Sequence, residues 1–326
     1  MRSVCVLNCV LFATLGACKA QEPGPDLVFV SNEGTNAVAI IDGRSGRVEG
    51  QLQTGHRPRG LASSPDGRIL YVAASEANRI EAWDRRQRRL LRSYVAGTDP
   101  ERFALARDGK SLFVANEDAS QVSRLDLTSG AILWQAAVGP EPEGIAVSPD
   151  GKLVVATAEA SSTVHFLDAA SGDAIGTAIV GSRPRDVLFV PSANEIWVSS
   201  EQRGTIAVFD AATLKAKATI DLVPAFPDLD DVQAVEMEVT RDGKRAFVAM
   251  GRSDHVAEID PRTHRVVRSF PTGFRTWGID LAPDETRLYA ASGLSGELTI
   301  IDLATNEVAE TVELGGKPWT AEAVAR

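Results

Sequence analysis

Short stretches of alternating apolar and polar residues run through the chain from residue 26 onwards, separated by turns rich in Pro, Gly, Asp and Ser. In residues 144–186 this pattern predicts four strands, at 144–148, 153–157, 163–168 and 174–180. Pro, Gly, Asp and Ser favour the corners because they supply a fixed or positive φ and cap local backbone groups. Each such unit is therefore expected to form one small antiparallel sheet.

The unit recurs along the chain at a nearly constant spacing. An aspartate closes the third strand of each unit, at intervals of 42 residues with one exception of 50: Asp42, Asp84, Asp126, Asp168, Asp210, Asp260 and Asp302. A four-stranded sheet of this size cannot bury both faces alone, but sheets stacked around a ring can, and a period of about 40–45 residues is that of a propeller blade. The sequence predicts an all-β protein, a seven-bladed β-propeller with four-stranded antiparallel blades.

The two ends of the repeat region complement each other. Residues 27–31 form a second-type strand with no first-type strand before it, and residues 320–326 form a first-type strand with no second-type strand after it. Pairing them completes the seventh blade and removes edges that invite aggregation. We expect one domain over residues 21–326, closed by pairing of the N- and C-terminal strands. The competing architecture, a solenoid, would need polar caps.

Residues 1–20 have the pattern of a targeting segment. Arg2 precedes an apolar stretch over residues 4–15 that is too short to span a bilayer. Residues 18–20 fit signal-peptidase cleavage before Gln21, whereas residues 15–18 resemble a bacterial lipobox in which Cys18 would be lipidated. We predict a signal peptide and a periplasmic protein. A lipid anchor on Cys18 is the alternative and the one route to a membrane.

Charge and cysteine content exclude several functions. The formal net charge is −10 and no basic face is concentrated, so nucleic acid is not an expected partner. The basic cluster at residues 85–89 is interpreted as a solvated hairpin turn. Cys5, Cys9 and Cys18 all precede the repeats. The propeller itself therefore has no disulfide, no cysteine-ligated metal and no covalent haem.

Candidate binding residues lie in the loops before first strands and between second and third strands, which should surround one mouth of the channel. Trp277 and Trp319 fall on neighbouring blades with Arg59 next in the ring, an arrangement suited to a flat or amphipathic ligand. The alternative is that these side chains only cap the channel. The residues predicted to bind a ligand or partner are Glu33, Arg57, Arg59, Arg102, Glu117, Glu143, Glu159, Arg185, Glu201, Glu236, Trp277 and Trp319.

Signals for catalysis are weak. No histidine pair has metal-ligand spacing, and neither a Gly-x-Ser-x-Gly elbow nor a Walker loop occurs. Facing carboxylates such as Glu117 and Glu159 could hold Ca²⁺, but a hydrated acidic ring is the more frequent arrangement. We predict no catalytic residue and no metal site. The eight extra residues, within 221–236, are interpreted as a lid, a partner contact or a tolerated surface insertion.

The units resemble the YVTN-type β-propeller repeat in residues 70–73 (Leu-Tyr-Val-Ala), 40–42 (Ile-Ile-Asp) and 55–58 (Gly-His-Arg-Pro). Residues 57–60, 99–105, 116–118, 141–144, 197–201 and 318–319 are similar to a bacterial propeller family encoded alongside systems for alcohol oxidation that depend on pyrroloquinoline quinone (PQQ). The resemblance implies the propeller fold and a partner among a PQQ-dependent dehydrogenase, its cytochrome partner or a small metabolite. Asp186 departs from the family pattern, which has a small residue there.

Two function classes stay open. We favour a non-catalytic propeller that binds a ligand or protein partner over a metal-assisted hydrolase similar to the lactonases that some seven-bladed propellers carry. A redox propeller is disfavoured, because only residues 126–134 resemble the tryptophan-docking repeat of PQQ dehydrogenases and the propeller has no cysteine. We therefore expect no cofactor, and a monomer.

Overall fold

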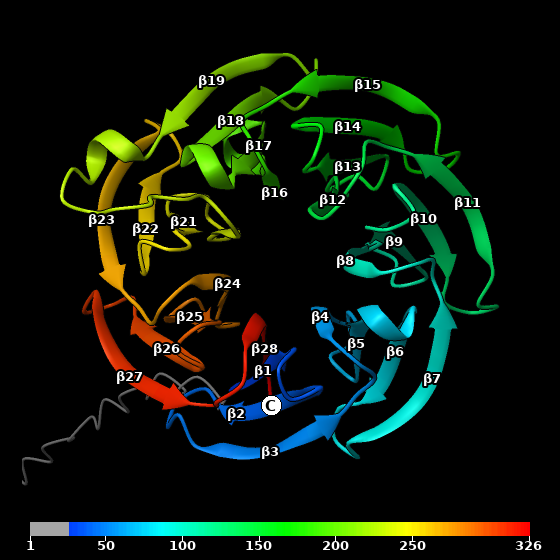
Figure 1. Ribbon diagram of the computed structural model, residues 1–326, viewed down its shortest axis with the longest axis horizontal. Helices are drawn as coiled ribbons and strands as arrows, with labels where there is room; N and C mark the ends of the chain where they lie inside the picture. Colours follow the sequence, from blue (N-terminus) through cyan, green and yellow to red (C-terminus); the bar gives the residue numbers. More distant parts are fainter. Residues whose placement is uncertain (1–25) are drawn as a thin grey trace, which may run out of the picture.

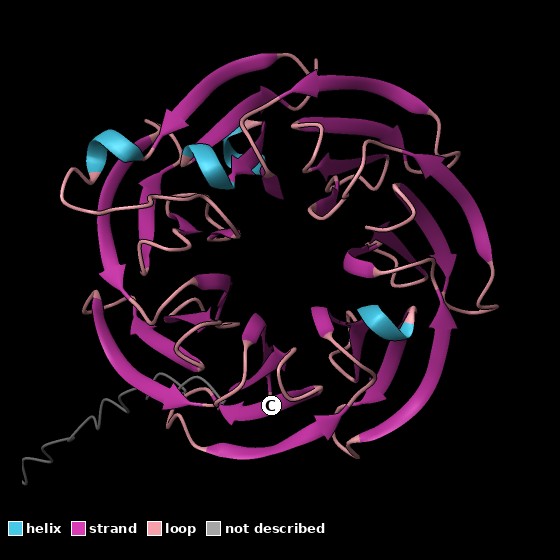
Figure 2. Cartoon of the chain, viewed as in Figure 1, coloured by secondary structure: helices cyan, strands magenta, loops and turns pink. Residues whose placement is uncertain are grey.

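Seven four-stranded sheets form a closed ring in the computed structural model, which describes residues 26–326 (Figure 1). The sheets stand around a central channel, and short 3₁₀ helices are the only other regular elements in this part of the chain (Figure 2). The predicted seven-bladed propeller is confirmed. The predicted signal peptide lies outside the described residues. Within residues 26–326, no helix has the length and apolar content needed to cross a membrane.

Each blade has four strands, which follow one another from the channel outwards. Blade 1 contains β28 (Pro318–Ala325), β1 (Asp26–Asn32), β2 (Ala37–Asp42) and β3 (Val48–Gln53); blade 2 contains β4 (Pro58–Ser63), β5 (Ile69–Ala74), β6 (Arg79–Asp84) and β7 (Arg89–Val95); blade 3 contains β8 (Pro100–Leu105), β9 (Ser111–Asn116), β10 (Gln121–Asp126) and β11 (Ile132–Ala137); blade 4 contains β12 (Ile145–Val147), β13 (Leu153–Ala158), β14 (Thr163–Asp168) and β15 (Ala174–Ile179).

The other three blades follow the same order. Blade 5 contains β16 (Pro184–Val190), β17 (Glu195–Ser200), β18 (Thr205–Asp210) and β19 (Ala216–Asp221); blade 6 contains β20 (Met237–Val239), β21 (Ala246–Ala249), β22 (His255–Asp260) and β23 (Arg265–Pro271); blade 7 contains β24 (Thr276–Leu281), β25 (Arg287–Ser292), β26 (Glu297–Asp302) and β27 (Glu307–Glu313). The 3₁₀ helices are η1 (Ser75–Ala77), η2 (Pro191–Ala193), η3 (Glu201–Arg203) and η4 (Val223–Ala225).

The repeated aspartate has a local structural role. Asp126 accepts a hydrogen bond from the backbone N–H of Ser129 at 2.6 Å, and Asp210 accepts one from Thr213 at 2.8 Å. This side-chain turn lets the third strand reverse tightly into the fourth. The same bond forms in most blades, which explains why the aspartate recurs with the period of the fold.

The hydrophobic core lies between neighbouring blades. Phe166 of blade 4 and Phe209 of blade 5, for example, pack edge to face with ring centroids 5.6 Å apart. Because each blade covers the face of the next, no blade buries its surface alone. The core therefore depends on an unbroken ring.

Strand pairing between β1 and β28 closes that ring. Leu27 pairs with Val324 and Val30 pairs with Ala321, in antiparallel register. Asn32 extends the closure, because its side chain donates to the carbonyl of Gly315 and accepts from the N–H of Lys317, both at 2.8 Å. The predicted pairing of the two terminal strands is confirmed.

The extra residues of the 50-residue interval belong to the core between blades 5 and 6. Leu222, Val232 and Ala234 are buried there, with Phe226 and Leu229 packed against them. A helical turn, η4, lies in the segment. The insertion is therefore anchored by apolar packing along its length.

Removal of residues 318–326 is expected to abolish the folded monomer. It deletes β28, exposes the paired edge of β1 and uncovers the apolar groups that β28 buries, and an exposed strand edge promotes association. Size-exclusion chromatography and thermal unfolding followed by circular dichroism measure the effect. Removal of Arg326 alone, which contacts only the surface carboxylates Asp42 and Glu49, should leave a cooperative monomer. A cooperative monomer after the longer deletion would contradict the closure mechanism.

Candidate functional site at one mouth of the channel

A cavity of about 210 Å³ lies at one mouth of the channel. Its lining comes from the loops that precede first strands and from those that join second to third strands. Six blades contribute Glu33, Arg57, Arg59, Glu101, Glu117, Glu143, Glu159, Arg183, Arg185, Arg275, Trp277 and Trp319. The cavity is therefore lined almost entirely by charged groups and two tryptophans.

One half of the lining is an ion-pair cluster around Arg57 and Arg59, which flank Pro58 at the start of β4. Arg57 lies 3.1 Å from Glu101 and 3.2 Å from Asp99, and Arg59 lies 3.0 Å from Glu33. Arg57 has a positive φ of 54°. Asp99, Glu141, Arg183 and Arg275 have a positive φ at the same place in their blades, so this left-handed turn belongs to the repeat.

The other half has the same design three blades away. Arg183 and Arg185 flank Pro184 at the start of β16, and Arg183 also has a positive φ, of 55°. Arg185 contacts Glu143 and Glu159 of blade 4 through one terminal nitrogen and lies 2.8 Å from Glu201 through Nε. Two Arg-Pro-Arg loops thus face the cavity from different sides.

Each tryptophan of the cavity has two guanidinium groups against its ring. Arg185 and Arg275 lie 4.7 and 4.2 Å from the centroid of Trp277. Arg59 and Arg102 lie 4.7 and 5.0 Å from the centroid of Trp319. Such cation–π contacts fix the arginines in place while leaving guanidinium N–H groups for other partners.

Arg102 of β8 crosses the channel. Its guanidinium lies 2.5 Å from Glu236 of blade 6 and 3.4 Å from Asp186 of blade 5. Both carboxylates also accept backbone N–H groups at 2.9 Å, Asp186 from Met237 and Glu236 from Ile279. Arg102 therefore ties blade 3 to blades 5 and 6 across the channel.

Further carboxylates line the channel on blades 6, 7 and 1. Asp280 accepts the N–H of Ala323 at 2.5 Å and Glu322 accepts the N–H of Ser63 at 2.8 Å, so each links its blade to the next. Burial raises the pKa of Glu236 and of Glu322 to about 7. Burial and neighbouring carboxylates raise the pKa values of Glu238 and Asp280 well above the ordinary range. These buried carboxyl groups therefore bind their protons more tightly than exposed carboxyl groups do.

Two carboxyl groups of the cavity also have raised pKa values. Burial raises the pKa of Glu101 to about 8, although Arg59 and Arg57 oppose the shift. Burial likewise raises the pKa of Glu159 to about 8, against the effect of Arg183. The cavity can thus present a protonated carboxyl, an ionised carboxylate and a guanidinium within one small volume.

The structure brings the predicted residues together at one end of the channel. Nine of the twelve line the cavity itself, namely Glu33, Arg57, Arg59, Glu117, Glu143, Glu159, Arg185, Trp277 and Trp319. Glu201 contacts Arg185 beside it, and Arg102 and Glu236 pair with each other, Arg102 also lying over Trp319. Their role in binding stays a prediction.

Sequence reasoning omitted three groups that complete the cluster: Arg183 and Arg275 line the cavity, and Asp99 pairs with Arg57. Glu101, which also lines the cavity, follows from the same loop column as Arg59 and Glu143 but was not among the residues predicted to bind. The Arg-Pro-Arg string at residues 183–185 matches that at 57–59 and was a usable signal for Arg183. Asp186, noted only as a departure from the family pattern, is a buried partner of Arg102.

One convergent carboxylate group among the described residues has metal-ligand spacing. Oxygens of Asp99, Glu101 and Glu117 lie within 4.8 Å of one another. The guanidinium of Arg57 already contacts Asp99 and Glu101. A cation here would have to displace Arg57, so the donor set fits a metal poorly.

Comparison with known proteins agrees with this architecture. The model of the YNCE-like beta-propeller family matches residues 20–280. Similar solved structures include hydrazine synthase of Kuenenia stuttgartiensis, with 22% identity, a TM-score of 0.76 and coverage of 90% of this chain and 99% of that chain. Among curated proteins, none matches the sequence.

Two further structures have names that mention lactonases. The periplasmic gluconolactonase PpgL of Pseudomonas aeruginosa is 21% identical, with a TM-score of 0.76 over 92% of this chain and 99% of that chain. A proposed 6-phosphogluconolactonase of Bacteroides fragilis is 18% identical, with a TM-score of 0.75 over 92% of this chain and 98% of that one. At these identities the similarity establishes the fold alone.

The stability of the protein is expected to fall as the pH rises from about 5 to about 8. Unfolded glutamates ionise near pH 4.3, whereas Glu101 and Glu159 ionise near 8 and Glu236 and Glu322 near 7 in the folded protein, so unfolding releases protons throughout this window. The contribution of these groups to the free energy of unfolding is fully present below the pKa of the unfolded state. It is lost as the pH rises through the pKa of the folded state. Urea unfolding at pH 5, 6.5 and 8 measures it. Glu101→Gln should reduce the slope, and a midpoint that rises with pH would contradict the assignment.

Arg102→Met is expected to destabilise the protein by about 3–5 kcal/mol at pH 8, because Asp186 and Glu236 would remain buried without their cation. The loss should be smaller at pH 5, where Glu236 holds a proton. Urea unfolding at both pH values tests this. Arg241→Met, which removes an exposed arginine paired with Glu285, is the matched control and should cost about 1 kcal/mol or less. Equal costs for the two variants would contradict the role of Arg102.

Proposed function

The chain belongs to the YNCE-like β-propeller family, and on this scaffold we propose that it binds, without catalysis, a small hydroxy acid at the Arg- and Trp-lined cavity. The observation that carries the proposal is the set of buried donors there without a hydrogen-bond acceptor. The Nε atoms of Arg59 and Arg275 and the indole N–H of Trp319 have no hydrogen-bond partner, whereas Nε of Arg183 lies 3.4 Å from a carboxylate oxygen of Glu201. A buried donor left unsatisfied costs free energy, which an acceptor from a ligand removes.

The lining defines the chemistry of the ligand. Five arginines surround the cavity and favour a carboxylate, which a guanidinium can bind through two parallel bonds. Glu117 also lines the cavity, and its carboxylate can accept hydrogen bonds from hydroxyl groups of a ligand. A molecule that carries a carboxylate and several hydroxyls satisfies both sets.

The size of the cavity favours a metabolite over a bulky cofactor. Its volume, about 210 Å³, is below the range of about 300–1,000 Å³ usual for drug-sized ligands. The faces of Trp277 and Trp319 offer apolar surface for the carbon chain. A protein partner could still cover the mouth, since the cavity opens to solvent.

The targeting pattern of residues 1–20 and the strings similar to the PQQ-associated family support a periplasmic setting next to alcohol oxidation. Oxidation of alcohols and sugars yields carboxylic acids and lactones. We place the protein in such a setting, with a hydroxy acid as its ligand and a PQQ-dependent dehydrogenase or its cytochrome as the candidate protein partner.

A hydrolase acting on lactones is the second candidate function. The observation that favours it is the pair of carboxyl groups, Glu101 and Glu159, whose pKa values of about 8 suit general acid–base catalysis near neutral pH. In such a reaction water would add to the lactone carbonyl and the ring C–O bond would break, giving the hydroxy acid. Retention of a metal and loss of activity on chelation would mark the metal-assisted form.

Gluconate, glycerate and tartrate serve as probes in isothermal titration calorimetry. We expect at least one to bind the wild-type protein, and Trp277→Leu and Arg275→Gln each to weaken binding tenfold or more, equivalent to about 1.4 kcal/mol. Both changes remove groups that line the cavity.

Trp134→Leu is the matched control, because Trp134 of β11 packs on Phe113 and does not line the cavity. Its affinity should equal that of the wild type. Failure of all three acids to bind at about 10 mM, or equal weakening by Trp134→Leu, would overturn the binding proposal. Turnover of gluconolactone that Glu159→Gln abolishes would favour the hydrolase instead.

A further inference from the structure

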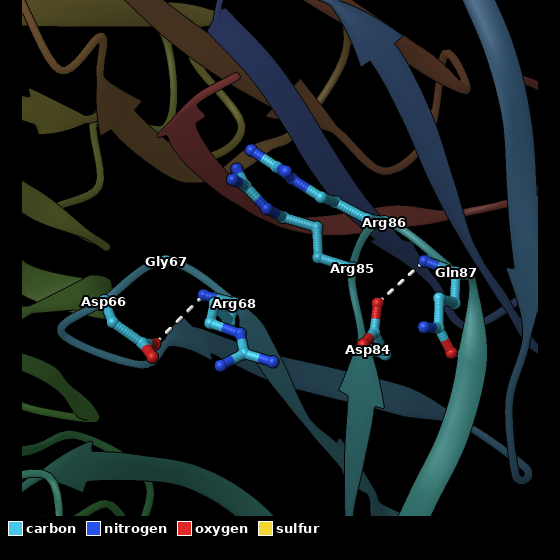
Figure 3. Close-up of a pocket in the computed structure, with 7 residues that line it drawn as sticks. All are labelled: Asp66, Gly67, Arg68, Asp84, Arg85, Arg86 and Gln87. Atoms are coloured by element: carbon cyan, nitrogen blue, oxygen red, sulfur yellow. Dashed lines mark hydrogen bonds between the residues drawn. The ribbon is translucent and has the colours of Figure 1, made fainter.

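A second cavity, of about 380 Å³, lies at the strand turns of blade 2, beside the carboxyl end of β28 (Figure 3). It is lined by Asp66, Gly67, Arg68, Asp84, Arg85, Arg86 and Gln87. None of these residues belongs to the cavity at the channel mouth. They lie in the β4–β5 and β6–β7 turns, at the ends of strands opposite to the loops that carry Arg57 and Glu117.

Arg85 is unusual within the repeat. It directly follows the aspartate that ends the third strand, a position that the other blades fill with Gly43, Leu127, Ala169, Ala211, Pro261 and Leu303. Leu127 and Leu303 are buried there, and Arg85 is only 8% exposed. The expectation that residues 85–89 form a solvated hairpin is correct for residues 86–89 and wrong for Arg85. The blade buries a charge where its relatives bury a methyl or leucine group.

The buried guanidinium is incompletely satisfied. One terminal nitrogen of Arg85 donates to the carbonyl of Ala325 in β28 at 2.7 Å, whereas Nε has no hydrogen-bond partner. No carboxylate of the described residues pairs with Arg85. Burial and the nearby Arg86 both lower the pKa of Arg85, as expected for a cation without a counter-ion.

The two carboxylates of the cavity are engaged elsewhere. Asp66 accepts the backbone N–H of Arg68 at 3.1 Å, and Asp84 accepts that of Gln87 at 2.7 Å, so each stabilises its own turn. In Figure 3 the side chains of Arg85 and Arg86 extend alongside each other, and that of Arg68 lies below them, between Asp66 and Asp84. Two like charges held side by side favour an anion between or beside them.

We propose that this cavity is a second binding site, specific for a phosphate or sulfate group carried by a small molecule, with Arg85 and Arg86 as its principal ligands. Guanidinium groups bind tetrahedral oxyanions through paired N–H donors, and the second terminal nitrogen of Arg85, which lies beside Gly67 of the cavity lining, supplies such a donor. The cavity volume exceeds that of a bare oxyanion, which leaves room for the rest of the molecule. This site shares no lining residue with the cavity at the channel mouth.

Occupancy should also stabilise the ring. Arg85 bonds to Ala325, and β28 is the strand that closes the propeller against β1. An anion that orders Arg85 therefore strengthens a contact to the closing strand. A ligand that binds only the folded state raises the unfolding temperature. At ligand concentrations above the Kd, the stabilisation grows with the logarithm of the concentration.

Inorganic phosphate is the probe, added to the full propeller at constant ionic strength with chloride and acetate as reference anions. We expect saturable binding of one phosphate per chain by calorimetry and a rise in unfolding temperature that chloride and acetate do not produce. Arg86→Gln, at an exposed position, should weaken binding tenfold or more. Arg85→Leu, the residue that blades 3 and 7 use, should abolish binding without lowering the unfolding temperature measured without phosphate.

Arg89→Gln is the matched control. It removes the same charge from the same hairpin but lies outside the cavity, and its affinity should stay within about twofold of the wild type, a difference of about 0.4 kcal/mol. Equal weakening by Arg86→Gln and Arg89→Gln would reveal general electrostatic attraction and overturn the proposal. The absence of saturable phosphate binding to the wild type at about 10 mM would also overturn it.

Discussion

The pairing of β1 with β28 is the interaction on which the rest of the structure depends. Each blade covers its neighbour, so an open ring would leave two apolar faces and two strand edges in water. Closure also brings Trp319, near the end of the chain, beside Arg59, near its start, with the guanidinium 4.7 Å from the ring centroid. The channel mouth is thus assembled from residues more than two hundred positions apart, and it exists only because the ends meet.

The energetics of the channel differ from those of the core. Carboxylates on blades 5, 6, 7 and 1 accept backbone N–H groups from the next blade, which ties the inner strands together. Burying these carboxylates costs free energy. Arg102 reduces this cost by ion pairing, and the raised pKa values reduce it further because a protonated carboxyl group carries no charge. Buried ion pairs of this kind add little net stability but fix geometry. At the channel mouth, burial leaves N–H groups of arginines and of Trp319 without an acceptor, and this is the physical basis of the proposed ligand binding.

The two proposed sites illustrate how a repeat acquires function. The repeat position that is Gly60, Gly144 and Gly278 in three blades is Arg102, Asp186 and Glu236 in three others, whereas the position of Arg85 carries a charge in one blade only. Such a departure is unfavourable for packing unless a partner compensates the charge. Arg102 is compensated across the channel by Glu236 and Asp186, and Arg85 has no such partner among the described residues. Arg102 is therefore part of a structural ion pair, whereas Arg85 is a buried cation that can pair with an anion from outside the protein.

By itself the sequence determined the fold, because blade length, turn chemistry and strand alternation are local properties that recur seven times. The complementary ends then determined closure. It also located the residues of the mouth, since the loop columns follow from strand order. Only the tertiary structure decided which charges pair: that Arg57 contacts Asp99, that Arg102 reaches blades 5 and 6, and that Arg85 of a hairpin is buried. Side-chain direction and burial across blades depend on packing between segments distant in sequence, and a repeat pattern carries no information about them.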